Sequence, residues 1–400
     1  MLITLDTLRA DSVRGEQAEM PAVEALAERG LVFERAYSST SSTQPTHASL
    51  FTGLHPWQHG VTRNGMVLGE EQHTLAERLR DSGFETSAIV ASFPLHRTFG
   101  YDQGFDRFDD SFVRSLQNRD EWRGQEVEGK AFYVLAKSVT DRAIADIDRA
   151  SAPKQFFWFH YFDAHAPYGD TRGKAPKRKL KGAAGEGPDY AASRKLYDLD
   201  VRSLDKSLAR LFDRLQRDAD SIETHIVVTS DHGESFGEDG SFGHETRVTG
   251  EQVHVPLIIA SPRVKSSIRD DPTGSVDVYS TLLSLAGARP DGSSRGIDLT
   301  SSSGVDSAVG MRRTFDLEED SEADTDREPR FYCLRGDKLY AGNSDRVFEN
   351  VSPYDEVTGE LGEELRELFR GYQSELERNA GQSSDDPDAR EGLSALGYTE

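Results

Sequence analysis

Apolar residues follow two alternating patterns along the first three quarters of the chain. Short runs of consecutive apolar residues are typical of buried strands, and apolar residues spaced three or four apart are typical of amphipathic helices. This alternation predicts an α/β fold, with a mostly parallel sheet and helices on both faces. The predicted strands are 2–5, 31–36, 86–91, 155–162, 224–230 and 255–260, and the predicted helices are 20–29, 74–82, 131–150, 190–218 and 276–285, with a further helix opening at 48–54.

The last quarter of the chain has a different pattern. Residues 306–330 are highly acidic, so we expect a linker or surface loop after a large first domain of residues 1–305. From 331 to about 351 the pattern indicates short strands, and a charged helix is expected over 362–378. We therefore predict a small C-terminal antiparallel α+β subdomain, with an acidic tail, over residues 331–400.

Composition narrows the class of protein. The chain has 400 residues, of which 36% are hydrophobic, and this is enough for a substantial core. No apolar run approaches the roughly 20 residues of a membrane span, and no signal-peptide pattern opens the chain, so we expect a cytoplasmic protein. The single cysteine, Cys333, excludes an intramolecular disulfide framework and a cysteine-rich metal site.

The charge is strongly acidic. A formal net charge of −23 argues against nonspecific binding to nucleic acid or to anionic membranes. Acidic residues number 70 against 47 basic ones, and only 11 of the basic residues are lysines. An acidic, lysine-poor surface fits a high-salt cytoplasm, where screening weakens self-repulsion. The alternative is ordinary acidity in a GC-rich genome.

Candidate ligands follow the predicted strands. Asp6 follows the first strand, Asp163 and His165 follow strand 155–162, and Asp231 and His232 follow strand 224–230. Ligands gather at the carboxyl ends of the strands in a parallel sheet, so these side chains can converge. Carboxylate oxygens and an imidazole suit a divalent cation, and this donor set does not choose among Mg²⁺, Mn²⁺, Ca²⁺ and Zn²⁺.

A candidate nucleophile lies in the segment Thr43–Gly53. Thr43 precedes Pro45, a residue that favours a helix start, and His47 follows shortly after. A cation touching the Thr43 hydroxyl would lower its pKa, and helix amides would attract an anionic ester. Taken singly these signals are weak, because an Asp after a strand often caps a helix and a Thr before a Pro often makes a turn.

The order of these motifs resembles the sulfatase branch of the alkaline phosphatase superfamily. The resemblance implies that Asp6, Asp231 and His232 bind the metal, and that Thr43 is both a ligand and the nucleophile. It also implies that His165 contacts the substrate or assists the leaving group. The matching segments are 3–11, 43–53, 160–168, 229–234, 242–244, 255–259, 276–283 and 393–398.

The resemblance leaves more than one role open for each of two further residues, Asp163 and His244. His244, with Asp163, would line the substrate pocket or form part of a second metal site. The alternatives are that Asp163 caps a helix and that His244 only holds its loop.

Several positions depart from the sulfatase pattern. Thr43 stands where sulfatases carry the Cys or Ser that becomes formylglycine, so no formylglycine is expected. His47, which we include among the catalytic residues, replaces the supporting Arg, and Thr7 replaces the second carboxylate of an Asp-Asp pair. The sulfate-binding Lys expected within 91–95 is absent. With these departures the chain resembles the relatives of sulfatases that use a Thr nucleophile. Those relatives attack phosphodiesters, phosphonate esters or phospholipid headgroups.

The sequence therefore predicts a metal-dependent hydrolase of sulfate or phosphate esters, acting on a small anionic ester with Thr43 as nucleophile. One alternative is a phosphodiester or phosphonate ester hydrolase, or a transferase of phospho-headgroups. Another is a catalytically inactive, anion-binding homologue of sulfatases.

Overall fold

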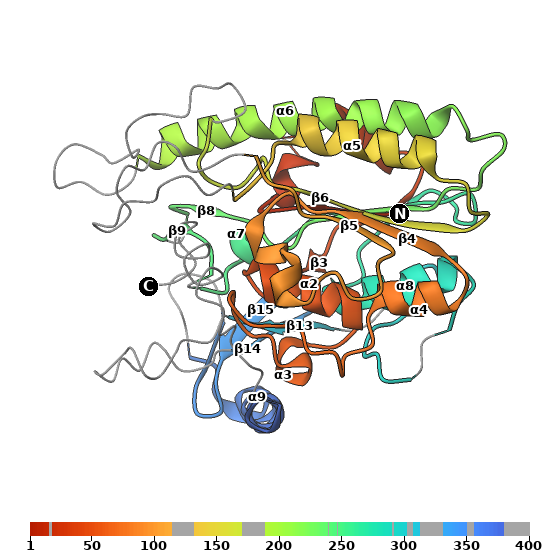
Figure 1. Ribbon diagram of the computed structural model, residues 1–400. Helices are drawn as coiled ribbons and strands as arrows, with labels where there is room; N and C mark the ends of the chain where they lie inside the picture. The colour runs from red at the N-terminus through yellow and green to blue at the C-terminus, as the bar shows by residue number, and fades with distance from the viewer. Residues whose placement is uncertain are drawn as a thin grey trace.

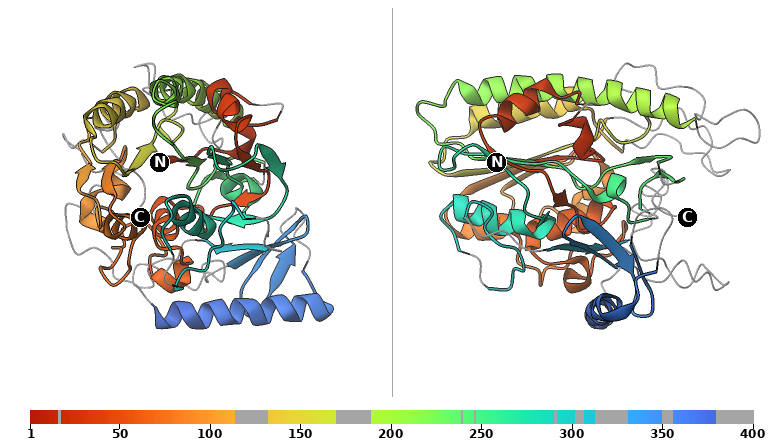
Figure 2. Two further views of the ribbon diagram at one scale, coloured as in Figure 1. Left: turned by 90° about the vertical axis from the view of Figure 1, so that its right-hand side faces the viewer. Right: turned by 180° about the vertical axis from the view of Figure 1, so that it is seen from behind.

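A computed structural model gives the fold, which is shown from three sides in Figures 1 and 2. The predicted acidic tail, from residue 380 onward, and most of the predicted acidic linker lie outside the part of the chain that is described. That part comprises residues 1–15, 18–113, 132–169, 189–238, 240–245, 247–289, 292–301, 307–312, 331–349 and 356–379.

A central sheet organises the larger part of the chain. Its strand order is β11-β2-β10-β7-β1-β6-β4-β5, and β10 runs antiparallel to both of its neighbours while the other pairs are parallel. The predicted mostly parallel sheet is confirmed. The strands are β1 Leu2–Leu5, β2 Leu31–Phe33, β4 Glu85–Ile89, β5 Arg107–Asp109, β6 Gln155–Tyr161, β7 Ile226–Thr229, β10 Leu257–Ala260 and β11 Ser267–Arg269.

Helices cover both faces of this sheet, as predicted. Figure 1 shows α5 and α6 on one face and α2, α4 and α8 on the other. Two short strand pairs, β3 with β12 and β8 with β9, lie outside the central sheet. The bounds are α1 Pro21–Ala27, α2 Thr43–Thr52, α3 Pro56–His59, α4 Leu75–Asp81, α5 Ala136–Arg149, α6 Tyr190–Gln216, α7 Gly250–Val253, α8 Ser275–Leu285, β3 Ala36–Tyr37, β8 Ser235–Phe236, β9 Phe242–Gly243 and β12 Thr273–Gly274.

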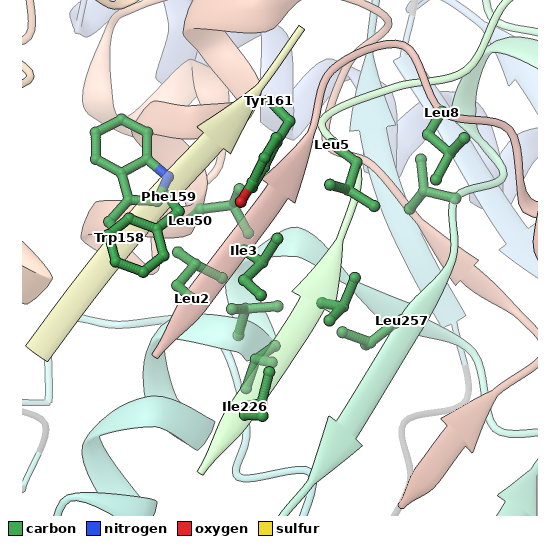
Figure 3. Packing of buried hydrophobic residues seen from close by; sticks show 14 of the residues in the cluster. Leu2, Ile3, Leu5, Leu8, Leu50, Trp158, Phe159, Tyr161, Ile226 and Leu257 are labelled. Atoms are coloured by element: carbon green, nitrogen blue, oxygen red, sulfur yellow. The ribbon is translucent and has the colours of Figure 1, made fainter. Parts of the chain in front are cut away.

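The core lies on both sides of β1, whose four residues are all buried. β1 pairs with β6 on one side and with β7 on the other, and its side chains Leu2, Ile3 and Leu5 pack in the buried hydrophobic cluster (Figure 3). Burial on both faces explains why these strands are continuous apolar runs without alternation. The core therefore holds the carboxyl ends of β7, β1 and β6 rigidly side by side.

Two helices within residues 1–305 begin more than one residue away from the predicted start. α2 begins at Thr43 instead of Ala48, so Thr43 lies in the first turn of the helix and Pro45 is its third residue. α5 begins at Ala136 instead of residue 131, because Tyr133 bridges to Ser92 and holds the chain extended before the helix. The first of these differences matters for the chemistry, because it fixes the Thr43 side chain to a helix terminus.

The C-terminal part forms the predicted antiparallel sheet with one helix, and it includes a strand from the predicted linker. Residues 307–311, expected to belong to an acidic linker or surface loop, form β13 and pair with β14. The prediction was wrong here because residues 307–311 carry no charge, and after Asp306 the next acidic residue is Asp316. The sheet order is β13-β14-β15-β16, with β13 Ser307–Met311, β14 Phe331–Arg335, β15 Lys338–Gly342, β16 Val347–Glu349 and the helix α9 Gly359–Arg378.

This subdomain packs against the segment that leads into α2. The Tyr332 hydroxyl donates to the carbonyl of Ser38, and the Met311 amide donates to the carbonyl of Ser39 over 2.9 Å. A Cβ atom on Gly310 would lie only 2.3 Å from that Ser39 oxygen. The C-terminal sheet thus supports the approach to Thr43.

Among the described residues, no helix is long and apolar enough to span a membrane.

Acid should destabilise the fold through buried histidines on the α2–α3 side. Burial lowers the pKa of both His55 and His59 to about 3. The unfolded chain takes up these protons near pH 6.5, so the free energy of unfolding should fall as the pH drops below 6.5. In denaturant titrations from pH 7.5 to 4.5, His59→Gln should reduce this slope by up to about 1.4 kcal/mol per pH unit. An unchanged slope would contradict the burial of a neutral His59.

Candidate functional site

The predicted ligands Asp6, Asp231 and His232 lie together at the carboxyl edge of the sheet. Asp6 directly follows β1, and Asp231 and His232 follow the neighbouring strand β7. Their ligand atoms all lie within 4.8 Å of one another, and all three side chains are buried. Among the residues that the structure describes, this is the one group of three His, Cys, Asp or Glu side chains able to hold a metal ion.

Thr7 orients both carboxylates of this group. Its hydroxyl donates to Oδ1 of Asp6 over 2.7 Å, and its amide donates to Oδ1 of Asp231 over 3.0 Å. Thr7 has a φ of 62°, an uncommon conformation for a non-glycine residue, and it turns the chain sharply after β1. The residue that replaces a carboxylate in the sulfatase pattern therefore aligns the two carboxylates that are present.

One oxygen of Asp231 has no hydrogen-bond partner although it is buried. Oδ1 accepts the amides of Thr7 and His232, while Oδ2 accepts no hydrogen bond. Oδ2 lies 3.6 Å from Nε2 of His232. An unsatisfied buried carboxylate oxygen costs free energy, and a bound cation is the usual explanation for one.

The His232 ring presents Nε2 to the same place. Nδ1 donates to the carbonyl of Gly233 over 2.9 Å, which leaves Nε2 as the atom available to a ligand. Burial lowers the pKa of His232, but the negative charges of Asp231 and Asp6 outweigh burial and raise it above 6.5. Burial raises the pKa of Asp6 in turn. A cation in this group would favour the charged carboxylates and the neutral imidazole that binding needs.

Thr43 completes the group. Its Oγ1 lies 3.5 Å from Nε2 of His232, and the residue is fully buried in the first turn of α2. Two carboxylates, an imidazole and a hydroxyl thus face one point from three separate segments of the chain. The donor set and the unpartnered Asp231 oxygen fit a divalent cation.

His47 supports Thr43 from the next turn of α2. Trp158 Nε1 donates to Oγ1 of Thr4 over 3.0 Å, and this hydroxyl lies 3.1 Å from Nε2 of His47. Nδ1 of His47 lies 2.8 Å from the carbonyl oxygen of Thr43, which can only accept, so Nδ1 carries the proton. Burial lowers the pKa of His47 to about 3, so the ring is neutral. Nε2 thus anchors the ring to Thr4, and Nδ1 holds the carbonyl of Thr43.

His160 is a site residue that sequence reasoning did not single out. It lies within β6, where Nδ1 accepts the amide of Ala91 and Nε2 lies 3.2 Å from Oδ2 of Asp6. Because Nδ1 accepts, Nε2 must carry the proton and donate to Asp6. Burial lowers the pKa of His160 to about 4, so it remains a neutral donor.

Removing the His160 ring should loosen Asp6 without removing a ligand. Partners that orient a metal ligand typically change metal affinity about 10- to 100-fold, so we expect His160→Ala to weaken Mn²⁺ binding by that factor. Isothermal titration of the purified variant measures this effect directly. The neighbouring buried variant Phe157→Leu, on the same strand, is the control. Wild-type affinity in His160→Ala would contradict the orienting role.

His165 and His244 form a wall of imidazoles beside the ligand group. The ring centroid of His244 lies 4.3 Å from the ring centroid of His232 and 5.1 Å from that of His165. Glu234, buried, accepts from Nδ1 of His244 over 2.9 Å and from the Tyr168 hydroxyl. Both predicted histidines are therefore near the site, and Glu234 is a further residue that the sequence did not reveal.

Asp163 has a different position. Its Oδ2 accepts the amide of Ala136, the first residue of α5, over 2.6 Å. This contact is the helix-capping alternative that the sequence left open, since a carboxylate satisfies an otherwise unpaired amide in the first turn. Asp163 is also outside the one potential metal group among the described residues.

Comparison with known proteins identifies the family. The sulfatase family model matches residues 1–288. The uncharacterized sulfatase YidJ of Escherichia coli is 22% identical over 320 residues, covering 68% of this chain and 64% of its own length. The N-acetylgalactosamine-6-sulfatase of Canis lupus familiaris is 26% identical over 319 residues, covering 68% and 58%. The chain thus spans about three fifths of the length of these relatives.

Solved structures give the same fold. The phosphonate monoester hydrolase of Silicibacter pomeroyi superposes with a TM-score of 0.70 at 20% identity, covering 95% of both chains. A protein of the alkaline phosphatase superfamily from Vibrio parahaemolyticus gives 0.64 at 18%, covering 96% of this chain and 88% of its own. These likenesses confirm the alkaline-phosphatase-like fold. With the family model matched over most of its length, the chain belongs to the sulfatase family.

Proposed function

We propose that this chain is a metal-dependent hydrolase of sulfate or phosphate esters, with Thr43 as its nucleophile. The observation that carries the proposal is the convergence of Asp6, Thr43, Asp231 and His232 on one point, with an unpartnered Asp231 oxygen among them. Family membership supports the reaction class, because the matched relatives carry sulfatase names.

Asp6, Asp231, His232 and Thr43 would hold the cation. A bound divalent cation supplies positive charge that favours the Thr43 alkoxide and the ester oxygens. The chain's own residues do the positioning: Thr7 and His160 fix the carboxylates, and His47 fixes the backbone of Thr43. Holding reacting groups in line supplies much of the rate in reactions of this class.

The reaction would proceed in two displacements. In the first, Oγ1 of Thr43 loses its proton and bonds to phosphorus or sulfur, and the ester oxygen leaves with the bonding pair and takes up a proton. In the second, water bonds to the same atom, and Oγ1 leaves with its bonding pair and recovers a proton. A sulfate or phosphate monoester gives the alcohol and inorganic sulfate or phosphate, a phosphodiester gives an alcohol and a phosphate monoester, and a phosphonate monoester gives an alcohol and a phosphonate. An acceptor alcohol in place of water would make the protein a transferase.

His165 and His244 would serve the substrate side of this reaction. Glu234 accepts from Nδ1 of His244, an arrangement that stabilises the imidazolium form. We assign His244 to protonating the leaving oxygen. Burial lowers the pKa of His165 to about 4, so His165 would bind the substrate as a neutral ring.

Phosphate, phosphonate and sulfate esters remain competing substrates. A threonine cannot become formylglycine, and this favours an adduct that water or an alcohol resolves by attack at phosphorus. The fold likeness to phosphonate monoester hydrolases of Silicibacter pomeroyi and Agrobacterium radiobacter makes phosphonate monoesters worth testing first.

A matrix of p-nitrophenyl esters against metals tests the proposal. Phosphonate monoesters, phosphate mono- and diesters, and sulfates would be assayed with Mn²⁺, Zn²⁺, Mg²⁺ and Ca²⁺ after chelation of the purified protein. We expect turnover of at least one ester class that chelation abolishes and one metal restores. Tight binding of phosphate or sulfate without turnover of any ester would instead favour the anion-binding homologue.

A further inference from the structure

The loop after β9 contains a buried glutamate that reaches the start of α2. Oε1 of Glu245 accepts the Ser42 hydroxyl over 2.9 Å and the Asn64 amide nitrogen, Nδ2, over 2.7 Å. Glu245 is buried and has a φ of 76°. A non-glycine residue in that conformation is held there by its surroundings, at a cost in backbone strain.

The first partner of Glu245 immediately precedes the proposed nucleophile. Ser42 is the N-cap residue of α2, yet its side chain does not cap the helix. A serine at this position usually accepts a helix amide. Here the Ser42 hydroxyl donates to Glu245 instead. This bond replaces the usual capping bond and attaches the residue before Thr43 to Glu245.

The second partner of Glu245 holds the residue that follows the nucleophile. Oδ1 of Asn64 accepts the amide of Gln44 over 2.8 Å, while its Nδ2 donates to Glu245. Asn64 therefore links Glu245 to the peptide group between Thr43 and Gln44. A hydrogen bond to a charged carboxylate is stronger than one between neutral groups, so the chain of contacts ends on a strong acceptor.

The carbonyl and the side chain of Gln44 also form hydrogen bonds that fix the residue. Its carbonyl accepts the Tyr101 hydroxyl over 2.5 Å, and its side chain donates to the carbonyl of Pro94 over 2.6 Å and accepts the amide of Gly65. The peptide group that follows Thr43 is thus held at both ends, by His47 on the Thr43 carbonyl and by Asn64 on the Gln44 amide, and the Thr40 hydroxyl donates to the Ser42 carbonyl of the preceding peptide group over 3.2 Å. The nucleophile's Cα therefore has little freedom, and its Oγ1 follows.

We propose that Glu245 is a positioning residue for Thr43, acting through Ser42 and Asn64 on the first turn of α2. The inference rests on the proposed role of Thr43 as nucleophile. His244 is the adjacent residue and pairs with Glu234. One short loop therefore positions both the nucleophile and the His244 imidazole. In this proposal Glu245 acts on Thr43 only through Ser42 and Asn64, which both donate to its Oε1.

Glu245→Gly is the sharpest test, because glycine adopts the positive φ without strain and loses only the side chain. A misplacement of about 1 Å at a reacting atom can cost about 100-fold in rate. We therefore expect kcat to fall about 10- to 100-fold, while KM and Mn²⁺ affinity stay within about 3-fold of wild type. Hydrogen exchange of the Gln44 amide should become faster.

Glu245→Gln should restore kcat to within about 5-fold, because its amide oxygen still accepts from Ser42 and Asn64. The exposed Glu71→Ala is the control and should change neither kcat nor exchange at Gln44. Asn64→Ala, which leaves the loop backbone untouched, should also speed exchange at Gln44. It covers the case in which Glu245→Gly folds poorly.

Wild-type exchange at Gln44 in Glu245→Gly would overturn the proposal, whatever happens to kcat. Wild-type kcat in that variant would overturn it as well. Failure of the proposed function gives a different result: Thr43→Val would then keep full turnover. In that case, exchange at Gln44 alone decides whether Glu245 fixes this helix start.

Discussion

Thr43→Val should abolish turnover, by on the order of 10⁴-fold or more in kcat. Valine keeps the branched shape of threonine in a position that is fully buried, so α2 should still begin at residue 43. What is lost is Oγ1, the atom that forms the new bond to phosphorus or sulfur. Steady-state assays with the best p-nitrophenyl ester measure the effect.

Thr43→Ser is the matched control for this result. It keeps the hydroxyl and removes one methyl group, so it should retain measurable turnover and the same product. Mn²⁺ binding should weaken in Thr43→Val but persist, because Asp6, Asp231 and His232 remain. Turnover of Thr43→Val within about 10-fold of wild type would remove Thr43 from the chemistry, since losing a covalent nucleophile costs far more than that.

Asp231→Asn should remove metal binding while leaving the fold intact. The asparagine Oδ1 can still accept the amides of Thr7 and His232, so the loop after β7 keeps its contacts. The unpartnered oxygen becomes an amide nitrogen, which cannot bind a cation. We expect Mn²⁺ affinity and metal-dependent turnover to fall by about 100-fold or more, since even partners of ligands cost 10- to 100-fold.

Thermal melts separate this effect from general destabilisation. Without metal, Asp231→Asn should be as stable as wild type or more stable, because a buried, unsatisfied carboxylate oxygen is removed. Added Mn²⁺ should raise the Tm of wild type and not of the variant. Asp205→Asn, which alters a buried carboxylate that caps α1, is the control and should keep the metal-induced shift. An equal shift in Asp231→Asn would show that Asp231 is not a ligand.

The sequence predicted the sheet and the positions of Asp6, Asp231 and His232 because each follows a continuous apolar strand. In a parallel sheet such positions meet at one edge, so convergence follows from topology alone. Thr43 could be predicted to lie nearby, but the start of α2 was placed too late. Pro45 fits several positions in a first turn, and the sequence alone did not show which one.

The supporting residues could not be predicted, for a different reason. His160 lies among the aromatic residues of β6, where nothing in the spacing shows that its Nε2 reaches Asp6. Thr7 orients two carboxylates only because its φ is positive. Glu245 and Asn64 lie 181 positions apart, and only the tertiary fold brings them together. Contacts of this kind depend on side-chain geometry, which periodicity does not encode.

The most direct test of the central claim is to quench the enzyme during turnover and map the modified peptide. With a slowly resolved ester, the peptide containing Thr43 should gain one phosphoryl or sulfuryl group, and Thr43→Val should gain none. For a chiral phosphate ester, the two displacements also predict retention of configuration at phosphorus. An adduct on another side chain, or inversion at phosphorus by direct attack of water, would contradict the account.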